Sequence, residues 1–470
     1  MFLLILPGVT AIHNPISSPP HGAASLPNKA ADPAYLLDLF RQILPPDASN
    51  DIDSGNATLF TTWFVIWLMV WQRTQGNASL GDTVAEIYLG PSFNDLPNCK
   101  RVREQNISIN TSAYSQGRSR LSIAAATHAA DLIFTTLTSD LTPAWKGRPV
   151  YLIDGSSLTL GHHPELMAKF PPAINQHGES HWPVVRYVVA HELATGLSPR
   201  WEWGPMYGPD ATSETALAGP LLSRLPDAAL IVYDRNFGIF SMTYVAVQAG
   251  HDVVVRMTDV RFRALTRSRE QTRPGEWAGV WRPSRSDRRS NPDLPADAEV
   301  SGRFVEILVK FKDKEFLLLL FTTDMTATSE ELAALYRKRW DIESDIRDVK
   351  QTLQMDILSG RSVEMVEKEM LLGVVAYNLT LQVRRLAAEQ AGVPVRELSF
   401  SRTLGLVRAF ARGMIGGSSE QWEERFERLL KGVGRCRLPR RPNRNYPREL
   451  IPRGRSFPQR KRDQVVNKKS

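Results

Sequence analysis

The sequence predicts an α/β protein, in which a mixed sheet is flanked by helices. Three observations predict this class. From Arg148 onward, short buried-strand patterns alternate with helical ones, which is typical of an α/β layer. Residues 34–130 carry only helical patterns, which predicts a helical N-terminal domain. Residues 260–327 break the alternation with an arginine-rich loop and a hairpin pattern, which predicts a β-rich insertion.

Composition limits the class of protein further. The chain has 470 residues, of which 42% are apolar and 23% charged, so we expect most of it to fold. Its two cysteines, Cys99 and Cys436, exclude a disulfide framework and a cysteine zinc site, and they favour a cytoplasmic location. The apolar stretch 59–72 is shorter than the about 20 residues that span a bilayer. We therefore expect a buried helix there and no membrane segment.

The net charge of +8 is unevenly distributed. Residues 435–470 hold 13 Lys and Arg against two acids, a balance of +11, which leaves the rest of the chain at −3. This proline-rich tail lacks apolar runs, so we expect it to be disordered alone and attracted to polyanions. The alternative is a solubilising tail, but the density of arginine favours nucleic acid.

The patterns divide the chain into seven segments in order. The first is irregular and rich in Pro, Ser and Ala; the second is helical, and its "KRVREQ" and "GRSRLS" cations suit DNA phosphates or are simply solvated. The predicted segments are an irregular start (1–33), a helical and DNA-binding domain (34–145), the first part of the α/β core (146–259), the β-rich insertion (260–327), a core helix (328–360), a helical C-terminal region (361–434) and the basic tail (435–470).

Two predicted strands end in an acid. Asp154 follows "PVYLI" and Asp234 follows "AALIVY", and each precedes a turn. Acids at the carboxyl ends of strands lie where ligand sites of open α/β sheets form. For either residue alone, a turn or capping role is the commoner explanation.

The helix predicted after Thr328 carries a third acid among cations. Thr328 and Glu331 form a capping-box pattern that starts this helix. At about 100° per residue, Tyr336, Arg339, Glu343 and Lys350 share an arc of about 60° at the edge of an apolar stripe. The alternative is a surface helix with i,i+4 ion pairs, each contributing only about 0.3–0.5 kcal/mol.

Three carboxylates together would suit a divalent metal. Asp154, Asp234 and Glu343 are oxygen-only ligands, which Mg²⁺ and Mn²⁺ prefer. Two such ions about 3.5–4 Å apart activate a nucleophile and stabilise the leaving oxygen at a phosphodiester. Arg339 and Lys350 are then suited to hold neighbouring phosphates.

At this point the sequence resembles a known family. The spacing Tyr336-x₂-Arg339-x₃-Glu343-x₆-Lys350, with "IDGSSL", "VYDRNFG" and "EMLLGVVAYNL", is similar to insertion-sequence DDE transposases of the Tyr-Arg-Glu-Lys group. The resemblance covers about residues 110–390. It implies a ribonuclease-H-like catalytic domain, metal-dependent cleavage at transposon ends, often through a DNA hairpin, and attack of the 3′-hydroxyl on target DNA. It also implies a homodimer that binds terminal inverted repeats in double-stranded DNA.

The resemblance assigns roles to individual residues. It makes Asp154, Asp234 and Glu343 the catalytic metal ligands, and it makes Tyr336, Arg339 and Lys350 contacts to DNA. Three weaker DNA-binding candidates are Arg235, Trp277 and Trp281. Relatives use aromatic residues of the insertion to hold a flipped base, but a pair of tryptophans is more often the core of a small sheet.

Two other functions are compatible with the same motifs. A transposase relic or regulator would bind DNA without cleaving it, although a relic has no reason to retain all three acids. A different ribonuclease-H-like nuclease would cut DNA strands but never join them.

Overall fold

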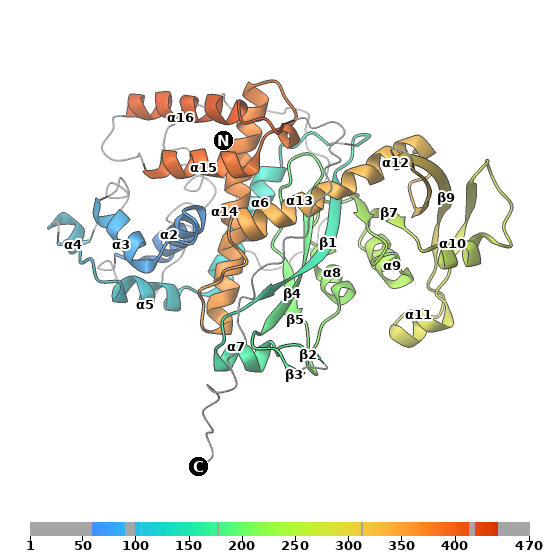
Figure 1. The fold of residues 1–470 in the computed structure, drawn as a ribbon, viewed down its shortest axis with the longest axis horizontal. Helices are drawn as coiled ribbons and strands as arrows, with labels where there is room; N and C mark the ends of the chain where they lie inside the picture. Colours follow the sequence, from blue (N-terminus) through green and yellow to red (C-terminus); the bar gives the residue numbers. More distant parts are fainter. Residues whose placement is uncertain are drawn as a thin grey trace, which may run out of the picture.

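A computed structural model describes residues 59–89, 99–104, 106–143, 145–175, 178–311, 314–412 and 419–439. Helices pack around one eight-stranded mixed sheet (Figure 1). This arrangement confirms the predicted α/β class.

The sheet is built around a central strand that carries the first predicted acid. β1 (Val150–Thr159) pairs antiparallel with β4 (Val184–Glu192) and parallel with β6 (Leu230–Tyr233). β7 (Asp252–Arg256) pairs parallel with β6, and β5 (Glu202–Pro205) forms the edge beside β4. Two short strands, β2 (Ile174–Asn175) and β3 (Gly178–Glu179), form a separate small sheet.

The strands expected in the insertion continue the same sheet. β10 (Lys314–Thr322) pairs antiparallel with β7, and β9 (Val300–Phe311) and β8 (Glu276–Trp281) follow it to the far edge. The β9–β10 pair is the hairpin that the sequence predicts at residues 312–314. Two helices, α10 (Asp259–Thr266) and α11 (Arg285–Ser290), interrupt these strands.

Successive residues of the central strands pack against helices on opposite faces of the sheet. In β1, Leu152 belongs to the core shared with α14 and α6, whereas Ile153 belongs to the core shared with α8 and α9. The same alternation holds in β6 for Val232 and Tyr233. Because successive strand residues point to opposite faces, one continuous apolar run covers both faces of the sheet.

The helices outside the active-site segment have the following bounds. They are α2 (Thr62–Thr74), α3 (Leu80–Leu89), α4 (Lys100–Arg103), α5 (Ser112–Arg120), α6 (Ile123–Thr138), α7 (Pro164–Lys169), α8 (Glu214–Leu222), α9 (Phe240–Gln248), α14 (Val363–Gln390), α15 (Phe400–Arg412) and α16 (Ser419–Gly434). The buried helix predicted at residues 59–72 is confirmed as α2.

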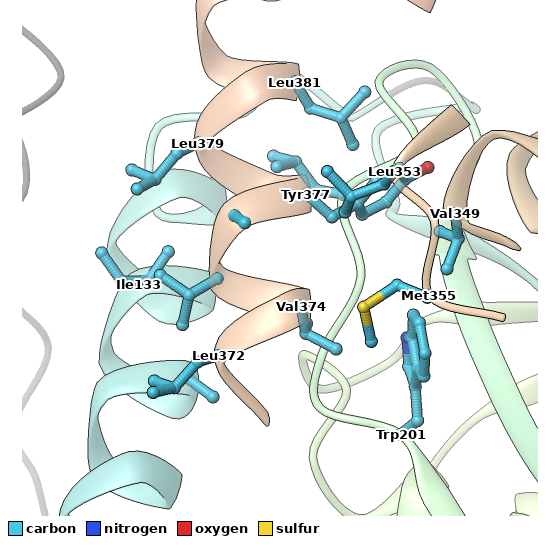
Figure 2. Close-up of a cluster of buried hydrophobic side chains, with 14 of the residues drawn as sticks. Ile133, Trp201, Val349, Leu353, Met355, Leu372, Val374, Tyr377, Leu379 and Leu381 are labelled. Atoms are coloured by element: carbon cyan, nitrogen blue, oxygen red, sulfur yellow. The ribbon is translucent and has the colours of Figure 1, made fainter. Parts of the chain in front are cut away.

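The long helix α14 joins the N-terminal helices to the sheet. It contacts α2, α6, α15 and α16 (Figure 1). Figure 2 shows Leu372 and Leu379 on the side toward α6, and Val374 and Tyr377 on the side toward the segment that follows Glu343. The segment that carries the third predicted acid therefore packs against α14 through the residues that follow Glu343.

A glycine permits this packing to be close. Gly373 leaves room on α14 for the sulfur of Met355, and a Cβ at residue 373 would clash with that sulfur. Met355 is fully buried there, beside Trp201 in Figure 2.

Among the described helices, none is by itself long and apolar enough to cross a membrane. Only α5 and α6 taken together pass that test, and they are bent by 78° to each other. Sequence predictions for residues 1–58 and for the basic tail beyond residue 439 lie outside the described residues.

Candidate active site

The first two predicted acids lie side by side where the parallel pairing of β1 with β6 ends. The prediction that a strand ends at Asp154 and a turn follows is wrong, because β1 continues to Thr159 through its pairing with β4, whereas β6 does end before Asp234. Ile153 of β1 is in register with Tyr233 of β6, so Asp154 and Asp234 follow at the same edge. The Asp154 carboxylate accepts a hydrogen bond from the Gly155 amide at 2.8 Å, and 23% of its side chain is exposed.

Asp234 also has the turn role that the sequence left open. One of its carboxylate oxygens accepts hydrogen bonds from the amides of Asn236 (2.8 Å) and Phe237 (3.2 Å), which shapes the loop after β6. Gly238 ends this loop against the carbonyl of Arg256, where a Cβ would clash. The turn thus fixes the direction in which Asp234 points.

The third acid is carried by a helical segment that is less regular than predicted. The capping box at Thr328 is confirmed, and α12 (Ser329–Arg337) begins there. A 3₁₀ turn (Lys338–Trp340), α13 (Asp341–Arg347) and a π-helical turn (Asp348–Thr352) follow. The single 100° rotation assumed from the sequence is therefore only approximate. π-turns occur frequently at functional sites.

Arg339 links acids from two distant parts of the chain. Its guanidinium donates to the Glu343 carboxylate at 3.1 Å and lies 4.0 Å from the Asp154 carboxylate. The arginine side chain is 11% exposed, whereas that of Glu343 is 47% exposed. The i,i+4 ion pair of the alternative explanation is thus present, and its arginine also lies against the carboxylate of the first acid.

The π-turn places Lys350 against the central strand. Its ammonium donates to the Ser157 carbonyl at 2.8 Å and to the Ser156 hydroxyl at 3.3 Å. Burial lowers the pKa of this lysine. Lys350 therefore contacts the strand that carries Asp154, at the residues two and three positions after that acid.

Tyr336, near the end of α12, is the fourth residue of the predicted group. Its side chain is buried, and this burial raises the pKa of its phenol. The charge of Arg256, a residue that sequence reasoning missed, acts against this rise in pKa. Arg256 ends β7, whose Val255 is in register with Tyr233, so it lies beside Asp234. Its position at the end of the buried-strand pattern "DVVVR" was the signal in the sequence that could have identified Arg256.

Burial and neighbouring acids disfavour the ionised form of Asp154. The pKa of Asp154 is raised to about 6, first by burial and then by the charges of Asp234 and Glu214, against the Gly155 amide and Arg339, which lower it. Glu214, in the first turn of α8, was also missed; its carboxylate fills the space beside Gly155 where a Cβ would stand. A cation bound beside Asp154 would stabilise its ionised form.

The weaker candidates lie in two different environments. Arg235 is exposed next to Asp234. Trp277 packs edge-on against Phe262, and Trp281 packs against Phe321 at 5.1 Å between ring centroids. Both tryptophans are buried, which favours their alternative role as sheet core over base stacking.

The three carboxylates do not converge on one point in this structure. Nowhere in the described part of the chain do three His, Cys, Asp or Glu side chains form a group that could hold a metal ion. Glu343 faces Arg339, and its exposed side chain would have to turn from this partner to join Asp154 and Asp234.

Comparison with known proteins agrees with this geometry. Residues 145–379 match the family described as transposase DDE domain. The chain is also similar to the transposase InsG for insertion sequence element IS4 from Escherichia coli (strain K12). The two are 28% identical over 322 residues, which cover 67% of this chain and 70% of InsG.

The mixed sheet flanked by helices, together with the family match, defines a ribonuclease-H-like polynucleotidyl transferase. The chain belongs to the DDE transposase family, of the insertion-sequence type that the Tyr-Arg-Glu-Lys spacing predicts. It is a DNA-binding enzyme, and members of this family generally use divalent metal ions.

Proposed function

We propose that this transposase cleaves DNA at the ends of its own element and transfers the freed 3′-hydroxyl into target DNA, with Asp154, Asp234 and Glu343 as its catalytic carboxylates. The observation that carries the proposal is the position of Arg339, which contacts two of these acids from segments far apart in sequence. A surface ion pair alone gives no reason for the second contact.

The residues fit a divalent metal by type and charge. All three donors are carboxylate oxygens, which suit Mg²⁺ or Mn²⁺. The pKa of Asp154 is raised first by burial and then by Asp234 and Glu214, and a bound cation would offset both effects by stabilising the ionised carboxylate. Two bound ions supply Lewis-acid activation of the attacking oxygen and stabilisation of the leaving oxygen.

The chain's own cations would hold the DNA backbone. Arg339 offers a planar fork that matches a phosphate once Glu343 turns away, and Lys350 offers a point charge fixed by Ser157. Arg256, at the end of β7, is placed to bind a phosphate beside Asp234, and exposed Arg235 adds a further contact in our proposal. These groups fix where the scissile phosphate lies.

Partners and domains follow from the same proposal. We infer that residues 34–145 bind the terminal inverted repeats; the exposed cations of α4 support this role. A homodimer would pair two ends before strand transfer. A non-catalytic relic or regulator is the competing function, and it predicts binding without strand breaks.

The test is a cleavage assay with Mg²⁺ or Mn²⁺ on a plasmid that carries the inverted repeats flanking the gene. We expect breaks at the repeat ends, and joined products when target DNA is added. Asp154→Ala should abolish both reactions and retain repeat binding. Asp227→Asn, which changes an exposed acid remote from the site, is the control.

Repeat binding without breaks by the unmodified protein would contradict the proposal and favour the relic or regulator. Breaks without joined products would instead indicate a nuclease.

A further inference from the structure

A buried acid lies two residues after Glu343. Asp345 is on the same helix, α13, and is 2% exposed, whereas the Glu343 side chain is 47% exposed. Two residues correspond to about 200° around a helix, so the two carboxylates point in nearly opposite directions. Asp345 therefore points into the protein when Glu343 points toward solvent and the proposed metal site.

One arginine binds Asp345 and the end of a strand at the same time. Arg396 forms an ion pair with the Asp345 carboxylate. The same guanidinium donates to the carbonyls of Leu193 (3.1 Å) and Glu192 (3.0 Å), where β4 ends. A planar guanidinium with donors in fixed directions sets the distance between these two segments.

Arg396 is the direct ion-pair partner of Asp345, and buried Arg384 contributes a second positive charge nearby. Its second carboxylate oxygen has no hydrogen-bond partner among the residues that the structure describes. The His191 ring lies 4.0 Å away, but it contacts the Gly196 carbonyl at 2.9 Å, and burial lowers its pKa, which keeps it neutral. Tyr377 closes the cluster at 3.5 Å from the same histidine nitrogen.

The strand that Arg396 binds is the direct neighbour of the strand that carries Asp154. Glu192 of β4 is in register with Tyr151 of β1, and α13 contacts β1. Arg396 thus connects α13, the helix that carries Glu343, with β4, the strand that pairs with the Asp154 strand β1.

We propose that Asp345 and Arg396 are positioning residues, which fix the rotation of α13 so that Glu343 stays on the side of the helix from which it can turn toward Asp154. This inference rests on the proposed function of the three acids. A buried ion pair adds little net stability, because the cost of removing charges from water offsets their attraction, so its consequence here is geometric. Neither residue touches DNA or metal in this role.

The test uses a double variant, Asp345→Leu with Arg396→Met, which replaces both members of the buried pair by apolar groups. The neighbouring buried Arg384 keeps Asp348 as a nearby acid. Circular dichroism should show wild-type folding, and repeat DNA should bind with a Kd within about twofold of wild type. The Mn²⁺ affinity, measured by electron paramagnetic resonance of free Mn²⁺, should fall by about tenfold or more, with a similar loss in single-turnover cleavage.

Three further measurements make the result specific. Arg396→Lys keeps the charge but not the fork, and should lie between wild type and the double variant. Asp140→Asn with Arg385→Gln removes a two-bond ion pair remote from the acids and should leave Mn²⁺ affinity unchanged. Hydrogen exchange of the α13 amides should accelerate in the double variant alone.

A folded double variant with wild-type Mn²⁺ affinity, cleavage and α13 protection would overturn the positioning role. The proposed function fails separately: wild-type protein that binds no Mn²⁺ would contradict it. If the wild-type protein binds no Mn²⁺, hydrogen exchange of the α13 amides still tests the positioning role, because unchanged protection of these amides in the double variant would contradict it.

Discussion

Replacing Asp154 by asparagine should stabilise the metal-free protein while abolishing cleavage. The fold raises the pKa of this carboxyl from 3.8 to about 6, mainly through burial and then through its acidic neighbours. The side chain is 23% exposed, so solvent screens this effect only partly. A shift of about two pKa units corresponds to about 3 kcal/mol, which is the cost of holding the ionised form in the folded state.

The cost depends on pH in a defined direction. Because the folded-state pKa lies above the unfolded-state value, the penalty is absent at low pH and grows as pH rises from 3.8 to about 6. Asp154→Asn should therefore raise the free energy of unfolding by up to about 3 kcal/mol at pH 7.5, and by about 1.6 kcal/mol at pH 5. Asparagine retains an oxygen that can accept the Gly155 amide hydrogen bond.

Urea unfolding in EDTA, followed by tryptophan fluorescence at both pH values, measures this difference. Asp227→Asn is the control, because this exposed acid should leave stability within about 0.5 kcal/mol of wild type. The reasoning is refuted if Asp154→Asn is no more stable than wild type at pH 7.5. A gain that is equal at the two pH values would also refute it.

Three further predictions concern Glu343, Lys350 and the packing of α14 against Met355. Glu343→Gln should retain repeat binding but abolish cleavage, measured on labelled ends; normal cleavage would remove it from the site. Lys350→Ala should weaken repeat binding and lower the slope of log Kd against log salt by about 0.9; an unchanged slope would exclude a phosphate contact. Gly373→Ala should destabilise the fold by about 1–3 kcal/mol in urea unfolding, through Met355, whereas exposed Gly405→Ala should stabilise it by about 1 kcal/mol; equal effects would contradict this packing.

The core strands and their acids were predictable because buried strands leave a strong local pattern. "PVYLID" and "AALIVYD" are continuous apolar runs that end in an acid, and both became neighbouring strands with Asp154 and Asp234 side by side. The continuation of β1 beyond Asp154 depends on its pairing with β4, which the local pattern does not show. The capping box at Thr328 was equally local, since it needs only residues three apart.

Other features depend on contacts that no short window contains. The π-turn at residues 348–352 forms where the segment packs on α14 and Lys350 reaches β1, so periodicity did not reveal it. Glu214 joins the site only through its contact with Gly155. Trp277 is held by Phe262, which the sequence pattern did not connect with it.

The central claim is that Asp154, Asp234 and Glu343 bind metal together. The most direct measurement is anomalous diffraction from crystals of the protein with cleaved repeat DNA and Mn²⁺. We predict two manganese peaks about 3.5–4 Å apart, bound by these three carboxylates, with Glu343 turned away from Arg339. Manganese bound elsewhere, with Glu343 still paired to Arg339, would contradict the account.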